Sequence, residues 1–127
     1  MIVVDTSAII TILLREAKAG ACMTAIEQEP DIAMSAGTLT EILIVAGRRG
    51  IKEEAATLIA GVNVEIVPVT PDSARRAADA YGRWGKGVHP ASLNYGDCFA
   101  YELATTRDCP LLFVGNDFAQ TDVRSAI

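Results

Sequence analysis

The chain opens with Ile2-Val3-Val4-Asp5-Thr6-Ser7, a short apolar run that ends in a carboxylate and two helix-capping residues. A similar arrangement returns near the other end, where Leu111-Leu112-Phe113-Val114 precede Gly115-Asn116-Asp117. Continuous apolar runs of this kind are typical of buried strands in parallel sheets. Ligands of such sheets bind beyond the carboxyl ends of the strands. We therefore expect Asp5 and Asp117 to lie at one common edge.

Between these two runs, strand-like and helix-like segments alternate along the sequence. The patterns predict strands over 2–5, 31–35, 64–69 and 111–114. They predict helices over 6–14, 17–28, 38–49, 51–60, 72–84 and 97–106, with a long loop over 85–96. This order favours an α/β fold in three Rossmann-like layers, with a parallel sheet flanked by helices on both faces. The length fits a single domain over 1–127.

Composition restricts the classes of protein that remain. The chain has no apolar run near the roughly 20 residues that a membrane helix needs. Its start lacks a secretory signal, so we expect a cytoplasmic protein without membrane attachment. The formal net charge of -5 argues against a simple basic nucleic-acid-binding surface. The three cysteines have no metal-binding spacing, and we expect reduced, mostly buried thiols.

Two further acids join Asp5 and Asp117 in the predicted elements. Glu41 falls near the N-terminal end of the helix over 38–49, and Asp97 opens the helix over 97–106. Four carboxylates in one pocket repel one another unless a divalent cation neutralises them. Oxygen ligands of this kind suit Mg²⁺ or Mn²⁺, and no spacing of His or Cys favours zinc.

Each acid also has a plain structural explanation. Asp5 and Asp97 could cap helices, and Asp117 could be a turn residue. Glu41 could lie on a solvated helix face. The single histidine, His89, falls in the long loop and is not assigned to catalysis. Cations before and within that loop could contact phosphates, or could simply be solvated: Arg75, Arg76, Arg83 and Lys86.

The motifs around the four acids resemble those of the PIN-domain ribonucleases, and most closely the VapC-type toxins of type II toxin–antitoxin modules. The resemblance covers the whole chain. It is carried by Asp5-Thr6-Ser7, Thr38-Leu39-Thr40-Glu41, Asn94-Tyr95-Gly96-Asp97-Cys98, Gly115-Asn116-Asp117-Phe118 and the downstream Thr121-Asp122. It implies a Mg²⁺- or Mn²⁺-dependent endoribonuclease in which Asp5, Glu41, Asp97 and Asp117 bind the metal. Thr6 would support them, with Asn116 and Asp122 as further contributors.

The same resemblance implies a set of partners. An RNA would be the substrate, and a cognate VapB-type antitoxin would cover apolar helices near the N-terminus and block the acidic pocket. The stretch Ile9-Ile10-Thr11-Ile12-Leu13-Leu14 and the segment from Ile42 to Val45 are apolar enough for that groove, for a homodimer or for a higher toxin–antitoxin assembly. Packing in the core would explain them equally well.

Three alternatives remain to be weighed. A PIN nuclease in RNA processing would share the site and differ in substrate and partner. A phosphoacceptor signalling domain would need an Asp after the third strand and a Lys near the last strand, and the chain has neither. A catalytically inactive binding module is disfavoured because all four acids are present.

Overall fold

The computed structural model describes residues 1–127 and contains one four-stranded parallel sheet in the order β3-β2-β1-β4. The strands are β1 (Ile2–Val4), β2 (Ile32–Ser35), β3 (Glu65–Val67) and β4 (Leu111–Leu112). In the middle of the sheet, Val3 pairs with Ala33 on one side and with Leu111 on the other. The predicted α/β class and parallel sheet are therefore confirmed.

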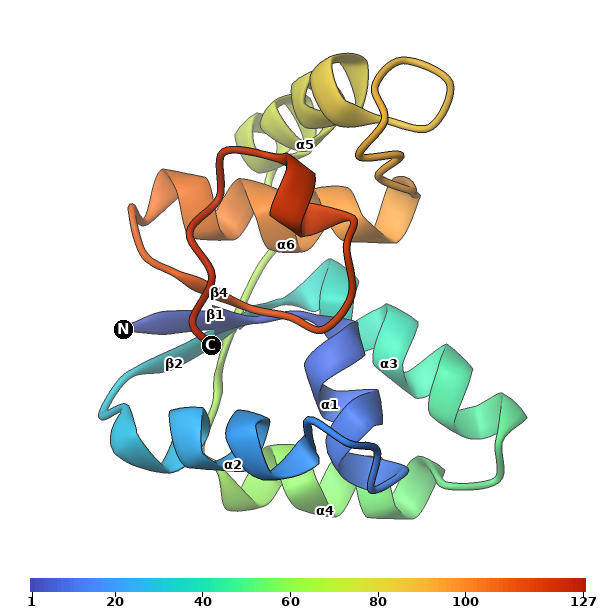
Figure 1. Cartoon of the computed structure of the whole chain (residues 1–127), viewed down its shortest axis with the longest axis vertical. Coiled ribbons are helices and arrows are strands. Elements are labelled where there is room, and N and C mark those ends of the chain that lie inside the picture. Colours follow the sequence, from blue (N-terminus) through green and yellow to red (C-terminus); the bar gives the residue numbers. More distant parts are fainter.

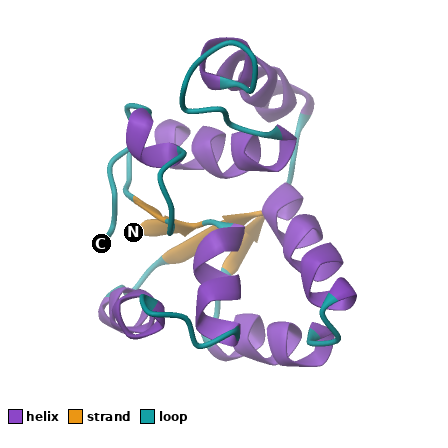
Figure 2. Ribbon diagram, turned by 45° about the vertical axis from the view of Figure 1, so that its right-hand side comes forward, coloured by secondary structure: helices purple, strands orange, loops and turns teal.

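Helices cover both faces of the sheet, as Figures 1 and 2 show. One face carries α5 (Pro71–Trp84) and α6 (Tyr95–Thr106), with the short 3₁₀ helix η1 (Phe118–Gln120) beside them. The other face carries α1 (Thr6–Leu13), α2 (Ala19–Gln28), α3 (Ala36–Arg48) and α4 (Lys52–Gly61). The expectation of three layers is confirmed.

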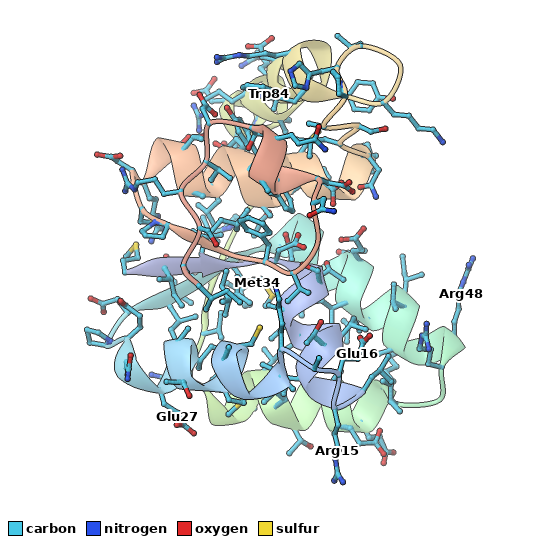
Figure 3. All side chains as sticks on the ribbon, in the orientation of Figure 1. Arg15, Glu16, Glu27, Met34, Arg48 and Trp84 are labelled. Carbon is cyan, nitrogen blue, oxygen red and sulfur yellow. The ribbon has the colours of Figure 1, made fainter.

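Two hydrophobic cores follow from the alternation of side chains along the strands. Val3 and Leu111 belong to the core under α5 and α6. Their neighbours Val4 and Leu112 belong to the core under α1 to α4, which also contains Met34 (Figure 3). Because the strands are buried on both faces, their sequences read as continuous apolar runs.

Most elements differ from their predicted bounds by one or two residues, and the differences at two strands and one helix have a clear physical reason. β3 lies at the edge of the sheet and spans only three residues, because Pro68 has no N–H to extend the ladder. β4 also ends early, at Leu112, and the Val114 N–H donates instead to the Ser7 hydroxyl at 3.0 Å. α6 begins at Tyr95 rather than Asp97, because the Asn94 side chain caps it and accepts from the Asp97 N–H.

The segment between α5 and α6 is folded back on itself rather than extended. Gly85 and Leu93 form an isolated β-bridge. His89 packs edge-on against Trp84, with ring centroids 4.7 Å apart, and its Nδ1 accepts from the Ala91 N–H. The histidine thus has a structural role. All three cysteines are buried and free, as predicted, and no helix is both long and apolar enough to span a bilayer.

Candidate active site

Asp5 lies where β1 ends and acts as the N-cap of α1. Its Oδ2 accepts two hydrogen bonds from Ser7, one from the N–H at 2.9 Å and one from the hydroxyl at 2.6 Å. Only 3% of the residue is exposed, and Oδ1 is buried without a hydrogen-bond partner. The plain role as a helix cap therefore uses one oxygen of Asp5 and leaves the other unsatisfied.

Glu41 lies in the second turn of α3 and reaches two other helices. Its Oε1 accepts a hydrogen bond of 2.5 Å from the Thr6 hydroxyl in α1. Its carboxylate also lies against Gly96 in the first turn of α6, where a Cβ would come within 2.6 Å of the Glu41 Cδ. Glu41 is therefore a half-buried carboxylate held between helices, not a solvated surface residue.

Asp97 is the third residue of α6 and forms a reciprocal capping box with Asn94. Its Oδ2 accepts from the Asn94 N–H at 2.9 Å. The pKa of Asp97 is raised to about 7, mainly by burial and also by the negative charges of Asp5, Glu41 and Asp117, while the Asn94 hydrogen bond opposes the shift. Asp97 is therefore close enough to the other three predicted acids for each of their charges to raise its pKa.

Burial likewise raises the pKa of Asp5 to about 6, although the hydrogen bonds from Ser7 oppose the shift. The charge of Glu41 adds to it. Without a bound cation, both carboxyl groups therefore have pKa values well above the ordinary 3.8. A cation bound there would oppose both shifts, because an opposite charge favours the ionised form.

The remaining predicted residues lie further along the C-terminal segment. Asp117 is exposed at the N-cap of η1, and its side chain makes no capping hydrogen bond. Asn116 is also exposed, and its carbonyl accepts from the Gln120 side chain at 3.4 Å. Asp122 instead accepts a hydrogen bond of 2.6 Å from the Tyr101 hydroxyl. The charge of Asp117 contributes to the raised pKa of Asp97, whereas Asp122 belongs to a separate network with Tyr101.

The donor set fits a hard cation in its chemistry. The available ligands are carboxylate oxygens, including the buried and unpartnered Oδ1 of Asp5, and such oxygens are what Mg²⁺ and Mn²⁺ prefer. No group of three or more His, Cys, Asp or Glu side chains is arranged to hold a metal ion by itself. Mg²⁺ keeps several of its waters in proteins, so it does not require direct ligation by three side chains.

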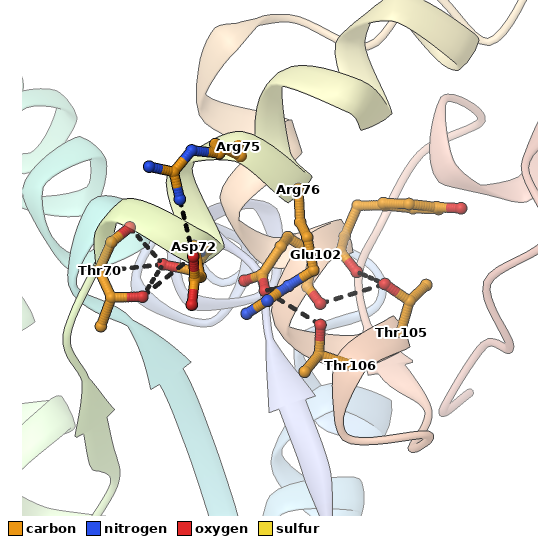
Figure 4. Close-up of polar contacts among 9 residues, drawn as sticks. Thr70, Asp72, Arg75, Arg76, Glu102, Thr105 and Thr106 are labelled. Carbon is orange, nitrogen blue, oxygen red and sulfur yellow. Dashed lines mark hydrogen bonds and ion pairs between the residues drawn. The ribbon is translucent and has the colours of Figure 1, made fainter.

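Three of the arginines considered as phosphate contacts are bound to carboxylates instead. Arg75 pairs with Asp72 at 2.7 Å. Arg76 donates from Nε to the buried Glu102 at 2.9 Å, as Figure 4 shows. The third, Arg83, lies 3.6 Å from Asp122 and over the Trp84 ring. Of the other cations, Arg48 points away from the sheet at the far end of α3 (Figure 3).

Three residues that shape the site were not identified from the sequence. Ser7 orients Asp5 and also ties β4 to α1. Gly96 leaves room for Glu41. Tyr101 holds Asp122. A Ser two residues after an Asp N-cap and a Gly before an Asp in a helix's first turn are local signals for the first two, whereas the contact of Tyr101 spans 21 residues and leaves no local signal.

The sequence and the fold of this chain are both similar to those of known proteins. The PIN domain family model matches residues 2–124. The chain is similar in fold to the crystal structure of VapC20 from Mycobacterium tuberculosis, described as a sarcin–ricin loop cleaving toxin, with a TM-score of 0.78 and 19% identity over 97% of this chain and 96% of that one. A toxin–antitoxin complex from Klebsiella pneumoniae matches with a TM-score of 0.73 and 18% identity over 96% and 93%.

Two relatives share much more of the sequence. Ribonuclease VapC42 of Mycobacterium tuberculosis is 40% identical over 128 residues, which cover 98% of each chain. Ribonuclease VapC of Mycolicibacterium smegmatis is 41% identical over 124 residues, which cover 95% of this chain and 96% of the relative. The chain therefore belongs to the PIN-domain family and, within it, to the VapC ribonucleases.

Proposed function

We propose that this protein is a Mg²⁺- or Mn²⁺-dependent endoribonuclease and the toxin of a type II toxin–antitoxin system. The observation that carries the proposal is the state of Asp5. Its Oδ1 is buried and has no hydrogen-bond partner, although a buried carboxylate oxygen without a partner is costly. Ionised neighbouring acids cannot satisfy it, because a carboxylate oxygen only accepts hydrogen bonds. A divalent cation supplies the missing partner and neutralises the neighbouring charges.

The residues that would hold this cation are Asp5, Glu41, Asp97 and Asp117. When bound, Mg²⁺ or Mn²⁺ supplies a more acidic water and neutralises charge on a phosphodiester. The chain itself orients the ligands: Ser7 holds Asp5, Thr6 holds Glu41, and the Asn94 N–H holds Asp97. Such supporting hydrogen bonds fix the orientation of metal-binding side chains. Asn116, which is exposed beside Asp117, is free to contact the substrate.

The names of the relatives support two parts of the proposal, namely that the substrate is RNA and that the protein acts as a toxin. VapC42 and the Mycolicibacterium protein are named ribonucleases, and fold neighbours come from a toxin–antitoxin complex and from VapBC2 of Rickettsia felis bound to promoter DNA. The latter matches with a TM-score of 0.70 and 15% identity over 98% of this chain. A PIN nuclease of RNA processing is the alternative, since it would have the same acidic site.

Side-chain burial separates the apolar residues that the core needs from those that could bind an antitoxin. Ile9 and Ile42 are fully buried, so the core accounts for them. Ile44 is 55% exposed on α3, and it lines a shallow hollow with Thr40, Leu43, Gly47, Arg48 and Lys52. This hollow follows the same helix that carries Glu41. A VapB-type segment bound along α3 would therefore reach the acidic site and block it.

A separate apolar groove suits a second copy of the chain. It has a volume of about 380 Å³ between α5 and the start of α6 and is lined by Val69, Ala74, Ala77, Ala78, Tyr81, Tyr95, Cys98 and Phe99. Tyr95 is 78% exposed at its rim. A two-fold dimer needs a self-complementary patch, and an exposed aromatic ring beside an apolar groove would supply one. The proposed homodimer would thus form next to Asp97.

The test is to incubate the purified protein with total cellular RNA in Mg²⁺, in Mn²⁺ and in EDTA, and to sequence the fragment ends. We expect cleavage at discrete sites in either metal and none in EDTA. Asp72→Asn serves as a matched control, because Asp72 is an exposed carboxylate paired only with Arg75. Cleavage that persists in EDTA would contradict the metal-dependent mechanism. Growth arrest on expression, relieved by the antitoxin, would separate the toxin from an RNA-processing nuclease.

A further inference from the structure

Asp117 is the one predicted metal ligand whose side chain accepts no hydrogen bond, whereas Asp5 is held by Ser7. It follows Gly115, whose φ of 113° turns the chain sharply after β4, and it has no side-chain capping bond of its own. Glu41 and Asp97, by contrast, are held by hydrogen bonds from Thr6 and Asn94. The position of Asp117 therefore depends on how the segment after it is attached.

Between Asp117 and Asp122, that segment is attached to the body of the protein at two places, and beyond Asp122 it is held again by the bridge of Ser125 to Leu111. The first is the Phe118 ring, which is buried against Phe113 with ring centroids 5.3 Å apart. The second is Asp122, whose Oδ1 accepts a 2.6 Å hydrogen bond from the Tyr101 hydroxyl. Thr121 links the two, because its hydroxyl donates to the Phe118 carbonyl at 2.7 Å. The carboxylate of Asp117 thus lies on a short loop that is held in place by the residues that follow it, Phe118 and Asp122.

The direction of the hydrogen bond at Tyr101 is fixed by Trp84. The Trp84 Nε1–H can only donate, and it lies 3.0 Å from the Tyr101 hydroxyl oxygen. The tyrosine oxygen must therefore accept from Trp84 and give its single proton to Asp122. Tyr101 is 7% exposed, and its bond with Trp84 is buried, whereas the Asp122 side chain is about half exposed. Arg83, 3.6 Å from the other oxygen of Asp122, adds an opposite charge.

Tyr101 and Asp97 are four residues apart on α6 and therefore lie on one face of the same rigid helix. We propose that Tyr101 is a positioning residue: through Asp122 it fixes the distance between the Asp117 loop and Asp97, and so sets the ligand geometry of the acidic site. This inference rests on the proposed metal-dependent function. Tyr101 touches neither metal nor RNA in this account and acts only through Asp122.

The test compares Tyr101→Phe with the wild type in Mn²⁺ binding, measured by calorimetry without RNA, and in the steady-state kinetics of RNA cleavage. Loss of a hydrogen bond that supports metal ligands lowers metal affinity by about 10-fold or more. We expect that loss, with a reduced kcat and an unchanged KM. Asp122→Asn should show a smaller loss, because an amide oxygen still accepts from the hydroxyl.

Thr106→Val is the matched control, because it removes a hydrogen bond to Glu102 at the other end of α6. It should change neither Mn²⁺ affinity nor kcat. Hydrogen exchange of residues 115–122 in the metal-free protein should speed up in Tyr101→Phe alone. Equal Mn²⁺ affinity in Tyr101→Phe and wild type would overturn the positioning role. Absence of Mn²⁺ binding by the wild type would instead overturn the proposed function, and this inference with it.

Discussion

The Thr6 hydroxyl donates a 2.5 Å hydrogen bond to the Glu41 carboxylate, across 35 residues of sequence. This bond joins the first turn of α1 to the second turn of α3. Because Asp5 precedes Thr6 directly, the same turn holds one acid and orients another. The bond therefore couples the geometry of Asp5 and Glu41.

Thr6→Val should remove the hydrogen bond to Glu41, while the valine side chain keeps the shape of the threonine side chain. We expect Mn²⁺ affinity to fall by about 10-fold, because support for metal ligands is worth that much in other sites. Thr6→Ser restores the hydroxyl and should restore most of the affinity. Calorimetry with Mn²⁺ on both variants measures the difference. Equal affinities for Thr6→Val and Thr6→Ser would show that the hydroxyl does not support the site.

Gly96→Ala tests the close approach of α6 to Glu41. The new Cβ would come within 2.6 Å of the Glu41 Cδ, so the carboxylate must move. Alanine is the better helix former by about 1 kcal/mol, which favours an intact fold. We expect cleavage of RNA to fall at least 10-fold while the thermal midpoint changes little. Gly82→Ala, in the exposed part of α5 with open space around it, is the control. Full activity in Gly96→Ala would place Glu41 outside the site.

Repulsion among the acids predicts a gain in stability when one of them is neutralised. In Asp97→Asn, the amide oxygen can still accept from the Asn94 N–H, and the repulsion by Asp5, Glu41 and Asp117 disappears. At about pH 8, where Asp97 is ionised, we expect the metal-free variant to melt a few degrees higher than the metal-free wild type. Differential scanning calorimetry in EDTA provides the comparison. A lower midpoint for the variant would argue against a shared acidic site.

The raised pKa values also fix the sign of the pH dependence. In the folded, metal-free protein Asp5 and Asp97 keep protons that the unfolded chain has lost, between the ordinary pKa of 3.8 and about 6 for Asp5 or about 7 for Asp97. The folded state then binds more protons, so the free energy of unfolding falls as pH rises through this window. For Asp5 the loss is on the order of 3 kcal/mol.

Denaturant unfolding in EDTA at pH values across that window measures this loss. Asp97→Asn is the control, because it lacks one of the two groups and should show a smaller fall. Other carboxylates, such as Glu65 with its pKa lowered by the Arg107 hydrogen bonds, contribute in the opposite direction. The difference between wild type and variant removes their contribution. An identical pH dependence for both proteins would be incompatible with the raised pKa of Asp97.

The order of elements and the edge that carries the acids could be predicted because both follow from local patterns. The apolar run before Asp5 is short, is buried on both faces, and leads directly into a capped helix. The bounds of β3 were less predictable, because an edge strand such as Glu65–Val67 pairs on one side only. At α6, Asn94 and Asp97 are both preferred capping residues, and the pattern does not say which one starts the helix.

The parts of the site that could not be predicted depend on contacts between distant segments. Nothing near Arg76 in the sequence indicates that Glu102, 26 residues away, would bind it. The unpartnered oxygen of Asp5 is also a property of the packed structure, since a sequence gives the residue but not its burial. The link from Trp84 through Tyr101 to Asp122 is of the same kind.

The most direct measurement is a calorimetric titration of the metal-free wild type and of Asp5→Asn with Mn²⁺ at about pH 8, above both raised pKa values. In Asp5→Asn, the amide oxygen can still accept the two hydrogen bonds from Ser7. The substitution removes the negative charge that would bind the cation. We expect saturable binding by the wild type and a loss of at least 10-fold in Asp5→Asn. Equal binding by the two proteins, or no binding by the wild type, would contradict the metal site.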